Sequence, residues 1–83
     1  MYNMTDDAKI VKTLDCTGLF CPEPLFQTRS NIDLINVGDV LEVLADDPAA
    51  EEDIKRLIKR TGHEILSFED NGGEFRFLIK KLK

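Results

Sequence analysis

The hydrophobic positions along the chain follow two periodicities, and the shorter one predicts β-strands. Residues 10–14 are rich in β-branched side chains and are followed by Thr17-Gly18, which predicts a strand that ends in a turn. Residues 40–45 are apolar except for Glu42, the pattern of a strand that is buried on nearly both faces. This second strand is therefore expected at or near the centre of a sheet.

The C-terminal part of the chain predicts a β-hairpin. Residues 64–68 form one strand segment, and in the next segment Phe75, Phe77 and Ile79 alternate with Arg76 and Lys80. Asn71-Gly72-Gly73 lies between the two segments and is typical of a hairpin turn. Four strands are thus expected in all.

Two helices are predicted between the strands. From Leu25 to Ile35 the apolar residues at positions 25, 32 and 35, with Thr28 between them, lie on one face of a helix, which ends at Asn36-Val37-Gly38-Asp39. The second helix has Asp47 as its N-cap and Pro48 at its first position, and it stops at Gly62. Its inward-facing stripe is formed by Ala50, Ile54, Leu57, Ile58 and Thr61.

The resulting element order, β-α-β-α-β-β, restricts the architecture. A helix that connects two parallel strands crosses over in a right-handed sense, so two crossovers in the same direction leave both helices on one side of the sheet. The predicted fold is an α/β (α+β) two-layer sandwich, with a mixed four-stranded sheet and two helices on one face. Residues 9–83 are expected to form this single domain, after a flexible, polar N-terminal tail at residues 1–8.

Composition and charge narrow the possible functions. The 83-residue chain has a formal net charge of -5, which disfavours binding to a phosphate backbone. No apolar run approaches the roughly 20 residues that a membrane-spanning helix needs, and the N-terminal sequence lacks the features of a signal peptide. The sequence therefore predicts a cytoplasmic protein with free thiols and with no direct contact to nucleic acid or membrane.

The segment Gly18-Leu19-Phe20-Cys21-Pro22-Glu23-Pro24 fixes the backbone around a cysteine. If Cys21 is the N-cap of the first helix, Pro22 is the first helical residue and the amide of Glu23 faces the sulfur. Alternatively, Glu23 is the N-cap and Pro24 the first helical residue, because proline disfavours a helical conformation in the residue before it. Both versions place the sulfur at the N-terminal end of the helix, beside the end of the first strand.

A helix start favours the thiolate form of Cys21. Amide hydrogen bonds and the partial positive charge there lower cysteine pKa values from about 8.5 to as low as roughly 3.5–7.5. Because Asp15 and Glu23 oppose ionisation by their charge, a moderate depression of the Cys21 pKa is expected. Arg29 lies farther along the helix. Its positive charge either helps to hold an anionic sulfur or to dock a partner protein, or the side chain only extends along the border of the apolar face with its charged end in solvent.

The remaining candidate residues carry weaker signals. Cys16 is interpreted as a small buried side chain, with a role as a second thiol for Cys21 as the alternative. His63, the only histidine, is interpreted as a solvated residue at a strand start rather than as a catalytic base. Asp46 and Asp47 are assigned to a strand end and a helix cap. Neither a metal site nor a cofactor is expected, because the chain has only three Cys and His residues.

Several motifs of the chain occur together in a known family. They are Leu14-Asp15-x-x-Gly18-Leu19-x-Cys21-Pro22-Glu23-Pro24-Leu25, then Gly38-Asp39, Ala45-Asp46-Asp47-Pro48-Ala49 and Gly62-His63-Glu64. In this arrangement they resemble the TusA/SirA-like sulfur carrier proteins. The resemblance extends from Ile10 to Lys81, and the Cys-Pro-x-Pro element in this frame is its most specific part.

The resemblance implies a function centred on Cys21, which would accept sulfane sulfur as a persulfide and pass it on. The implied partners are a cysteine desulfurase or rhodanese-type sulfur donor and a downstream relay protein. The implied pathways are tRNA thiolation, molybdenum cofactor synthesis and sulfur oxidation. Two alternatives stay open, a dithiol redox protein that uses Cys16 and Cys21 and a regulatory module that contacts RNA. The residues expected to support Cys21 are Asp15, Gly18, Pro22, Glu23, Pro24 and Arg29.

Overall fold

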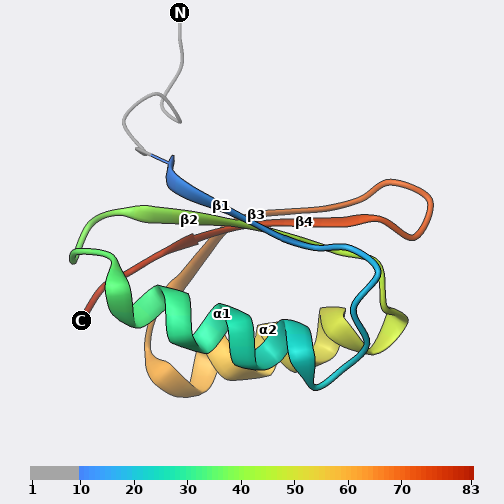
Figure 1. Ribbon diagram of the computed structural model, residues 1–83. Helices are drawn as coiled ribbons and strands as arrows, with labels where there is room; N and C mark the ends of the chain where they lie inside the picture. The colour runs from blue at the N-terminus through green and yellow to red at the C-terminus, as the bar shows by residue number, and fades with distance from the viewer. Residues whose placement is uncertain (1–9) are drawn as a thin grey trace, which may run out of the picture.

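The computed structural model describes residues 10–83, which form a sheet layer and a helix layer (Figure 1). The elements in chain order are β1 (Ile10–Cys16), α1 (Glu23–Leu34), β2 (Val40–Ala45), α2 (Pro48–Thr61), β3 (Glu64–Asp70) and β4 (Phe75–Lys80). The predicted order β-α-β-α-β-β is confirmed. The tail predicted at residues 1–8 lies outside the described residues.

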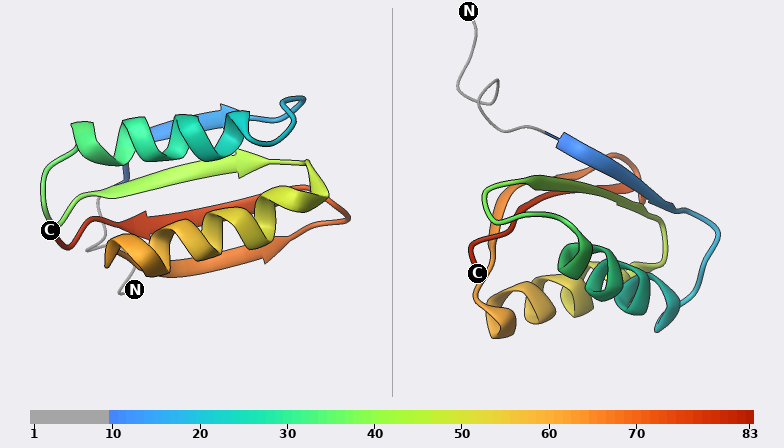
Figure 2. Two further views of the ribbon diagram at one scale, coloured as in Figure 1. Left: turned by 90° about the horizontal axis from the view of Figure 1, so that it is seen from below. Right: turned by 60° about the vertical axis from the view of Figure 1, so that its left-hand side comes forward.

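The strands lie in the order β1-β2-β4-β3. β1 and β2 are parallel, and β4 is antiparallel to both of its neighbours, β2 and β3. β2 is therefore one of the two central strands, as its apolar sequence predicts. Both helices cover the same face of the sheet (Figures 1 and 2), which confirms the two-layer sandwich with a mixed sheet.

The helix α2 has the ends that its sequence predicts. The Asp47 side chain accepts a hydrogen bond from the amide of Ala49 at 3.1 Å, and Pro48 is the first helical residue. At the other end Gly62 adopts the left-handed conformation, with φ at 85°, and its amide donates to the carbonyl of Ile58 at 3.1 Å. No helix within residues 10–83 is long and apolar enough to cross a membrane.

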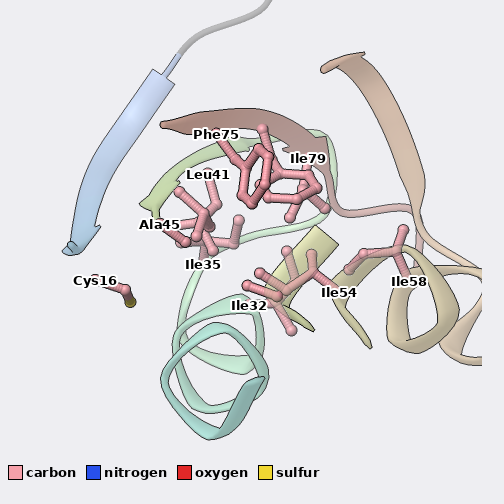
Figure 3. Close-up of a cluster of buried hydrophobic side chains, with 12 residues drawn as sticks. Cys16, Ile32, Ile35, Leu41, Ala45, Ile54, Ile58, Phe75 and Ile79 are labelled. Carbon is pink, nitrogen blue, oxygen red and sulfur yellow. The ribbon is translucent and has the colours of Figure 1, made fainter. Parts of the chain in front are cut away.

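The core lies between the sheet and the helices (Figure 3). Phe77 of β4 is fully buried, and α1 contributes Ile32 to the same cluster. The inner face of α1 also holds a buried polar residue, Asn31, whose Oδ1 accepts a hydrogen bond from Lys12 Nζ of β1 and whose Nδ2 donates to the Gln27 carbonyl at 2.7 Å. A polar contact thus ties α1 to the edge strand.

A polar row crosses the face of the sheet that the helices leave open. Glu42 of β2 accepts hydrogen bonds from Thr13 of β1 at 2.7 Å and from Arg76 of β4. Arg76 also lies 3.8 Å from a carboxylate oxygen of Glu69 on β3. The row therefore links all four strands, which gives Glu42 a structural role in an otherwise apolar strand.

Replacing Glu42 with glutamine is expected to lower the free energy of unfolding, and most strongly at pH values where the Glu42 carboxylate is ionised. Hydrogen bonds from Thr13 and then from Arg76 lower the pKa of Glu42. A lowered folded-state pKa contributes stability above the unfolded value of about 4.3, and this contribution is lost as the pH falls through the folded value. We expect the free energy of unfolding in urea to fall by about 1 kcal/mol near neutral pH, and to vary less with pH below about pH 5. The matched control is Glu69→Gln, since Glu69 is more exposed, and equal losses in both variants would contradict this role of Glu42.

Candidate functional site

The candidate site is the loop between β1 and α1, which contains Cys21. In Figures 1 and 2 this loop lies at the same end of the molecule as the turn between β2 and α2. The reason is that β1 and β2 are parallel, with Cys16 at the end of one strand paired with Ala45 at the end of the other. The segments that follow the two strands are thereby brought together.

Two consecutive aspartates after β2 hold the backbone of this loop. Asp46 Oδ1 accepts a hydrogen bond from the amide of Gly18 at 2.9 Å, and Asp47 Oδ2 accepts one from the amide of Cys21 at 2.6 Å. Gly18 has a φ of 84°, a conformation that glycine adopts at little cost. The position of Cys21 is therefore fixed by side chains from a neighbouring segment as well as by its own turn.

The start of α1 lies between the two predicted versions. Glu23 is the first helical residue and Pro22 the N-cap, one residue later than in the first version and one earlier than in the second. The Cys21–Pro22 peptide bond is cis. The amide of Glu23 donates to the carbonyl of Phe20 at 2.9 Å, so the prediction that it faces the sulfur is wrong. Pro24 fits the second helical position, because amides of the first turn have no partner within the helix.

The predicted depression of the Cys21 pKa is also wrong. Cys21 is a free cysteine, half-buried at the edge of the core cluster. Its burial, then its hydrogen bond to Asp53 and the charges of Asp53 and Asp47, raise the pKa of Cys21 to about 12. These two carboxylates belong to α2 and its N-cap, whereas the amide of Glu23, which was expected to stabilise the thiolate, donates to the carbonyl of Phe20.

The charges of Asp15 and Glu23 act on Cys16. The pKa of Cys16 is raised by its burial and then by the charges of Asp15 and Glu23. Asp15 itself accepts hydrogen bonds from the hydroxyl of Thr17 at 2.6 Å and from its amide at 3.0 Å, which lower the pKa of Asp15. Cys16 has no exposed surface, which agrees with its interpretation as a small buried side chain.

His63 lies at the other end of the helix layer. It follows Gly62 at the C-terminal end of α2, whose 14 residues span about 21 Å, whereas Cys21 contacts the N-cap of the same helix. The ring of His63 is not simply solvated, because it is half-buried and its Nδ1 accepts a hydrogen bond from the amide of Leu82 at 3.1 Å. Arg29 lines a hollow between the helices together with His63. The structure therefore brings neither residue to the sulfur.

Asp53 is the residue of the site that the sequence did not reveal, and Asp47 was assigned to helix capping alone. One signal pointed to Asp47, because the segments after two parallel strands meet at one edge of the sheet. Asp53 lies further along α2, and its influence on the pKa of Cys21 depends on the folded arrangement of the chain rather than on neighbouring positions in the sequence. Within residues 10–83 no three His, Cys, Asp or Glu side chains are grouped so that they could hold a metal ion.

Comparisons with known proteins agree on one family. The family model described as sulfurtransferase TusA matches residues 12–81, which include the whole site. The chain belongs to the TusA family. It is 47% identical over 74 residues to a putative sulfur carrier protein of Archaeoglobus fulgidus, covering 88% of this chain and 96% of that one. It is 40% identical over 68 residues to the sulfur carrier protein TusA of Allochromatium vinosum, covering 82% of this chain and 90% of the relative.

A solved structure shows that this TusA-family chain has a known fold. The crystal structure of a SirA-like protein from Desulfitobacterium hafniense superimposes with a TM-score of 0.76. The match covers 88% of this chain and all of the other, at 19% sequence identity. The two-layer arrangement is therefore shared even where the sequences have diverged.

Proposed function

We propose that this TusA-family protein is a sulfur carrier that holds sulfane sulfur as a persulfide on Cys21. The names of its relatives support the carrier role, and the difference in exposure between the two cysteines supports the residue. Cys21 is half-buried on a surface loop that Asp46 and Asp47 hold in place, whereas Cys16 is fully buried. This difference is the observation on which the assignment depends, because a carrier must present its sulfur to other proteins.

The transfer balances without an oxidant. The sulfur of Cys21 attacks the outer sulfur of a persulfide on the donor protein, so that a new S–S bond forms as the donor's S–S bond breaks. The proton that Cys21 loses ends on the thiol of the donor. A thiolate of the acceptor then takes the outer sulfur from Cys21 in the same way.

The partners that fit this chemistry are proteins that carry their own reactive cysteine. We propose a cysteine desulfurase or a rhodanese-type protein as the donor, and a relay protein of tRNA thiolation, molybdenum cofactor synthesis or sulfur oxidation as the acceptor. Free thiols are maintained in a reducing compartment, so the proposed location is the cytoplasm. The cysteine needs no pocket of its own, because each partner supplies an active site.

The alternatives are less well supported. A dithiol redox protein would need Cys16 to reach an external substrate, and Cys16 has no exposed surface. An RNA-contacting module would have to bind phosphates with a net charge of -5.

Sulfur loading tests the proposal. The protein is incubated with a cysteine desulfurase and cysteine, separated from both, and treated with cyanide, which releases sulfane sulfur as thiocyanate. We expect about one thiocyanate per chain, and the loaded protein should lose it when a thiol acceptor is added. A protein that instead loses both thiols and releases no thiocyanate would be a dithiol redox protein.

A further inference from the structure

Two of the five phenylalanines of the chain are exposed, and both lie close to Cys21 in the sequence. Phe20 is 78% exposed and Phe26 is 54% exposed, although both side chains are large and apolar. The other three phenylalanines pack together in or beside the core. An isolated exposed apolar residue is ordinary on a protein surface, whereas a group of large ones indicates a surface where another molecule binds.

The main chain around Phe20 is held on both sides of the ring. Its carbonyl accepts a hydrogen bond from the amide of Glu23 at 2.9 Å, and the amide of the next residue, Cys21, donates to Asp47 Oδ2 at 2.6 Å. Leu19 and Cys21 pack against the core cluster, so the ring between them projects into solvent from a fixed point. A partner that covers this ring orders little main chain, which lowers the entropic cost of the complex.

Phe26 lies one helical turn beyond the same loop. Its amide donates to the carbonyl of Pro22 at 3.0 Å, which places it one turn along α1 from the residue that follows Cys21. Pro24 and Thr28 are buried on the inner face of α1, and Phe26 lies midway between them in the sequence. Phe26 therefore belongs to the outer face of the helix, at its N-terminal end.

Sulfur transfer brings another protein onto these residues. An S–S bond is about 2.0 Å long, so the surface around the partner's reactive cysteine has to touch the surface around Cys21. An interface of standard size covers about 800 Å² of each partner, a patch that extends roughly 16 Å from its centre. Phe20 is the neighbour of Cys21, with their Cα atoms about 3.8 Å apart, and Phe26 is one helical turn away. Both phenylalanines fall within this patch.

We propose that Phe20 and Phe26 dock the carrier on its sulfur donor by filling an apolar cleft beside the reactive cysteine of the donor protein. This inference rests on the proposed carrier function, and it names the kind of surface that the donor presents. Aromatic side chains near the centre of an interface contribute more to binding than those at its edge. Phe20, the more exposed of the two and the neighbour of Cys21, is therefore the main contact, and Phe26 is the secondary one.

The test measures sulfur loading by a cysteine desulfurase at increasing concentrations of the carrier. Phe20→Ala is expected to raise the KM for the carrier about ten- to hundredfold, because most of the surface of this ring is buried only in the complex. The rate at saturating carrier should not change, since a contact made equally before and during transfer affects binding alone. Phe20→Leu keeps an apolar side chain, so its KM should lie between those of Phe20→Ala and the unmodified protein. Phe26→Ala should raise the KM less than Phe20→Ala.

The matched control is Leu34→Ala. Leu34 is 75% exposed, nearly as much as Phe20, but it is the last residue of α1, at the end away from the Cys21 loop (Figure 2). The 12 residues of α1 span about 18 Å. Leu34→Ala should therefore have the KM of the unmodified protein. An unchanged KM in Phe20→Ala, an equal rise in Leu34→Ala, or slower loading at saturation with the KM unchanged would each overturn the proposal.

A binding measurement separates this proposal from the carrier function. Isothermal titration calorimetry with the desulfurase uses Cys21→Ser, which cannot take up sulfur, with and without Phe20→Ala. We expect the added alanine to weaken the complex about ten- to hundredfold. Equal affinities would overturn the proposal and leave the carrier function intact. If the unmodified protein takes up no sulfur but Phe20→Ala still weakens the complex, the carrier function fails and the docking surface stands.

A second copy of the chain is the other molecule that could cover Phe20. In that case the unmodified protein would elute as a dimer in gel filtration, and Phe20→Ala would convert it to a monomer. This result would overturn the proposal, because the ring would then be buried before a donor arrives. We expect both proteins to elute as monomers.

Discussion

Replacing Cys21 with serine is expected to abolish sulfur loading, whereas replacing Cys16 with serine should leave sulfur loading unchanged. The oxygen of serine cannot form a persulfide, so Cys21→Ser removes the atom that receives the sulfur. Cys16 is fully buried and therefore cannot meet the cysteine of a donor protein. Thiocyanate released by cyanide after incubation with a desulfurase and cysteine measures both variants. We expect no thiocyanate from Cys21→Ser above an unloaded control.

The Cys16→Ser variant carries a risk, because it places a hydroxyl in the core. An unpaired buried hydroxyl costs about 1–3 kcal/mol. Cys16→Ala avoids this cost and serves as the second variant, with folding checked by circular dichroism. Retained loading in either folded variant supports the assignment to Cys21. If both Cys16 variants are folded but load no sulfur, Cys16 takes part in the chemistry and the dithiol alternative is favoured.

Cys21 in the isolated protein is expected to react slowly with iodoacetamide near neutral pH. A rise in pKa from 9.0 to about 12 leaves roughly 10³-fold less thiolate. A thiolate of higher pKa is also the better nucleophile. For each unit by which the pKa rises, the logarithm of the rate constant of the thiolate rises by about 0.4–0.5, which offsets part of the loss of thiolate. The expected rate is therefore roughly 30- to 60-fold below that of a synthetic peptide with the sequence of residues 18–26.

The pH profile distinguishes this cause from simple shielding. A protonated thiol predicts a rate that still rises with pH above 9, where the peptide has begun to level off, whereas shielding predicts a slow rate with an ordinary midpoint. The thiol form also stabilises the fold. Because the folded-state pKa is raised, this contribution is complete below the unfolded value near 9 and is lost as the pH rises towards about 12. A midpoint for Cys21 near or below that of the peptide would contradict the geometry of the site.

The layer architecture could be predicted because several independent signals agree. In α2 the cap at Asp47, the proline after it, the apolar stripe and Gly62 all describe the same helix, and the structure has it at those residues. The apolar sequence of β2 reflects its central place between β1 and β4. The handedness of the crossovers then leaves one arrangement of the helices. Local sequence signals and long-range packing therefore favour the same helices and strands in the same arrangement.

The electrostatics of the site could not be predicted, because they arise from contacts across the chain. Sequence reasoning near Cys21 weighed the residues next to it, Asp15 and Glu23, and the amides of its own helix. The groups that act on the sulfur, Asp47 and Asp53, lie 26 and 32 positions farther along the sequence and belong to α2 and its cap. His63 shows the same limit, since the amide that holds its ring belongs to Leu82.

The most direct test of the proposed function is the mass of the protein after incubation with a cysteine desulfurase and cysteine. We predict a gain of one sulfur atom, removed by a reducing thiol, with fragment ions that place the added sulfur on Cys21. An unchanged mass, a loss of two hydrogens from a Cys16–Cys21 disulfide, or an added sulfur on Cys16 would contradict the account.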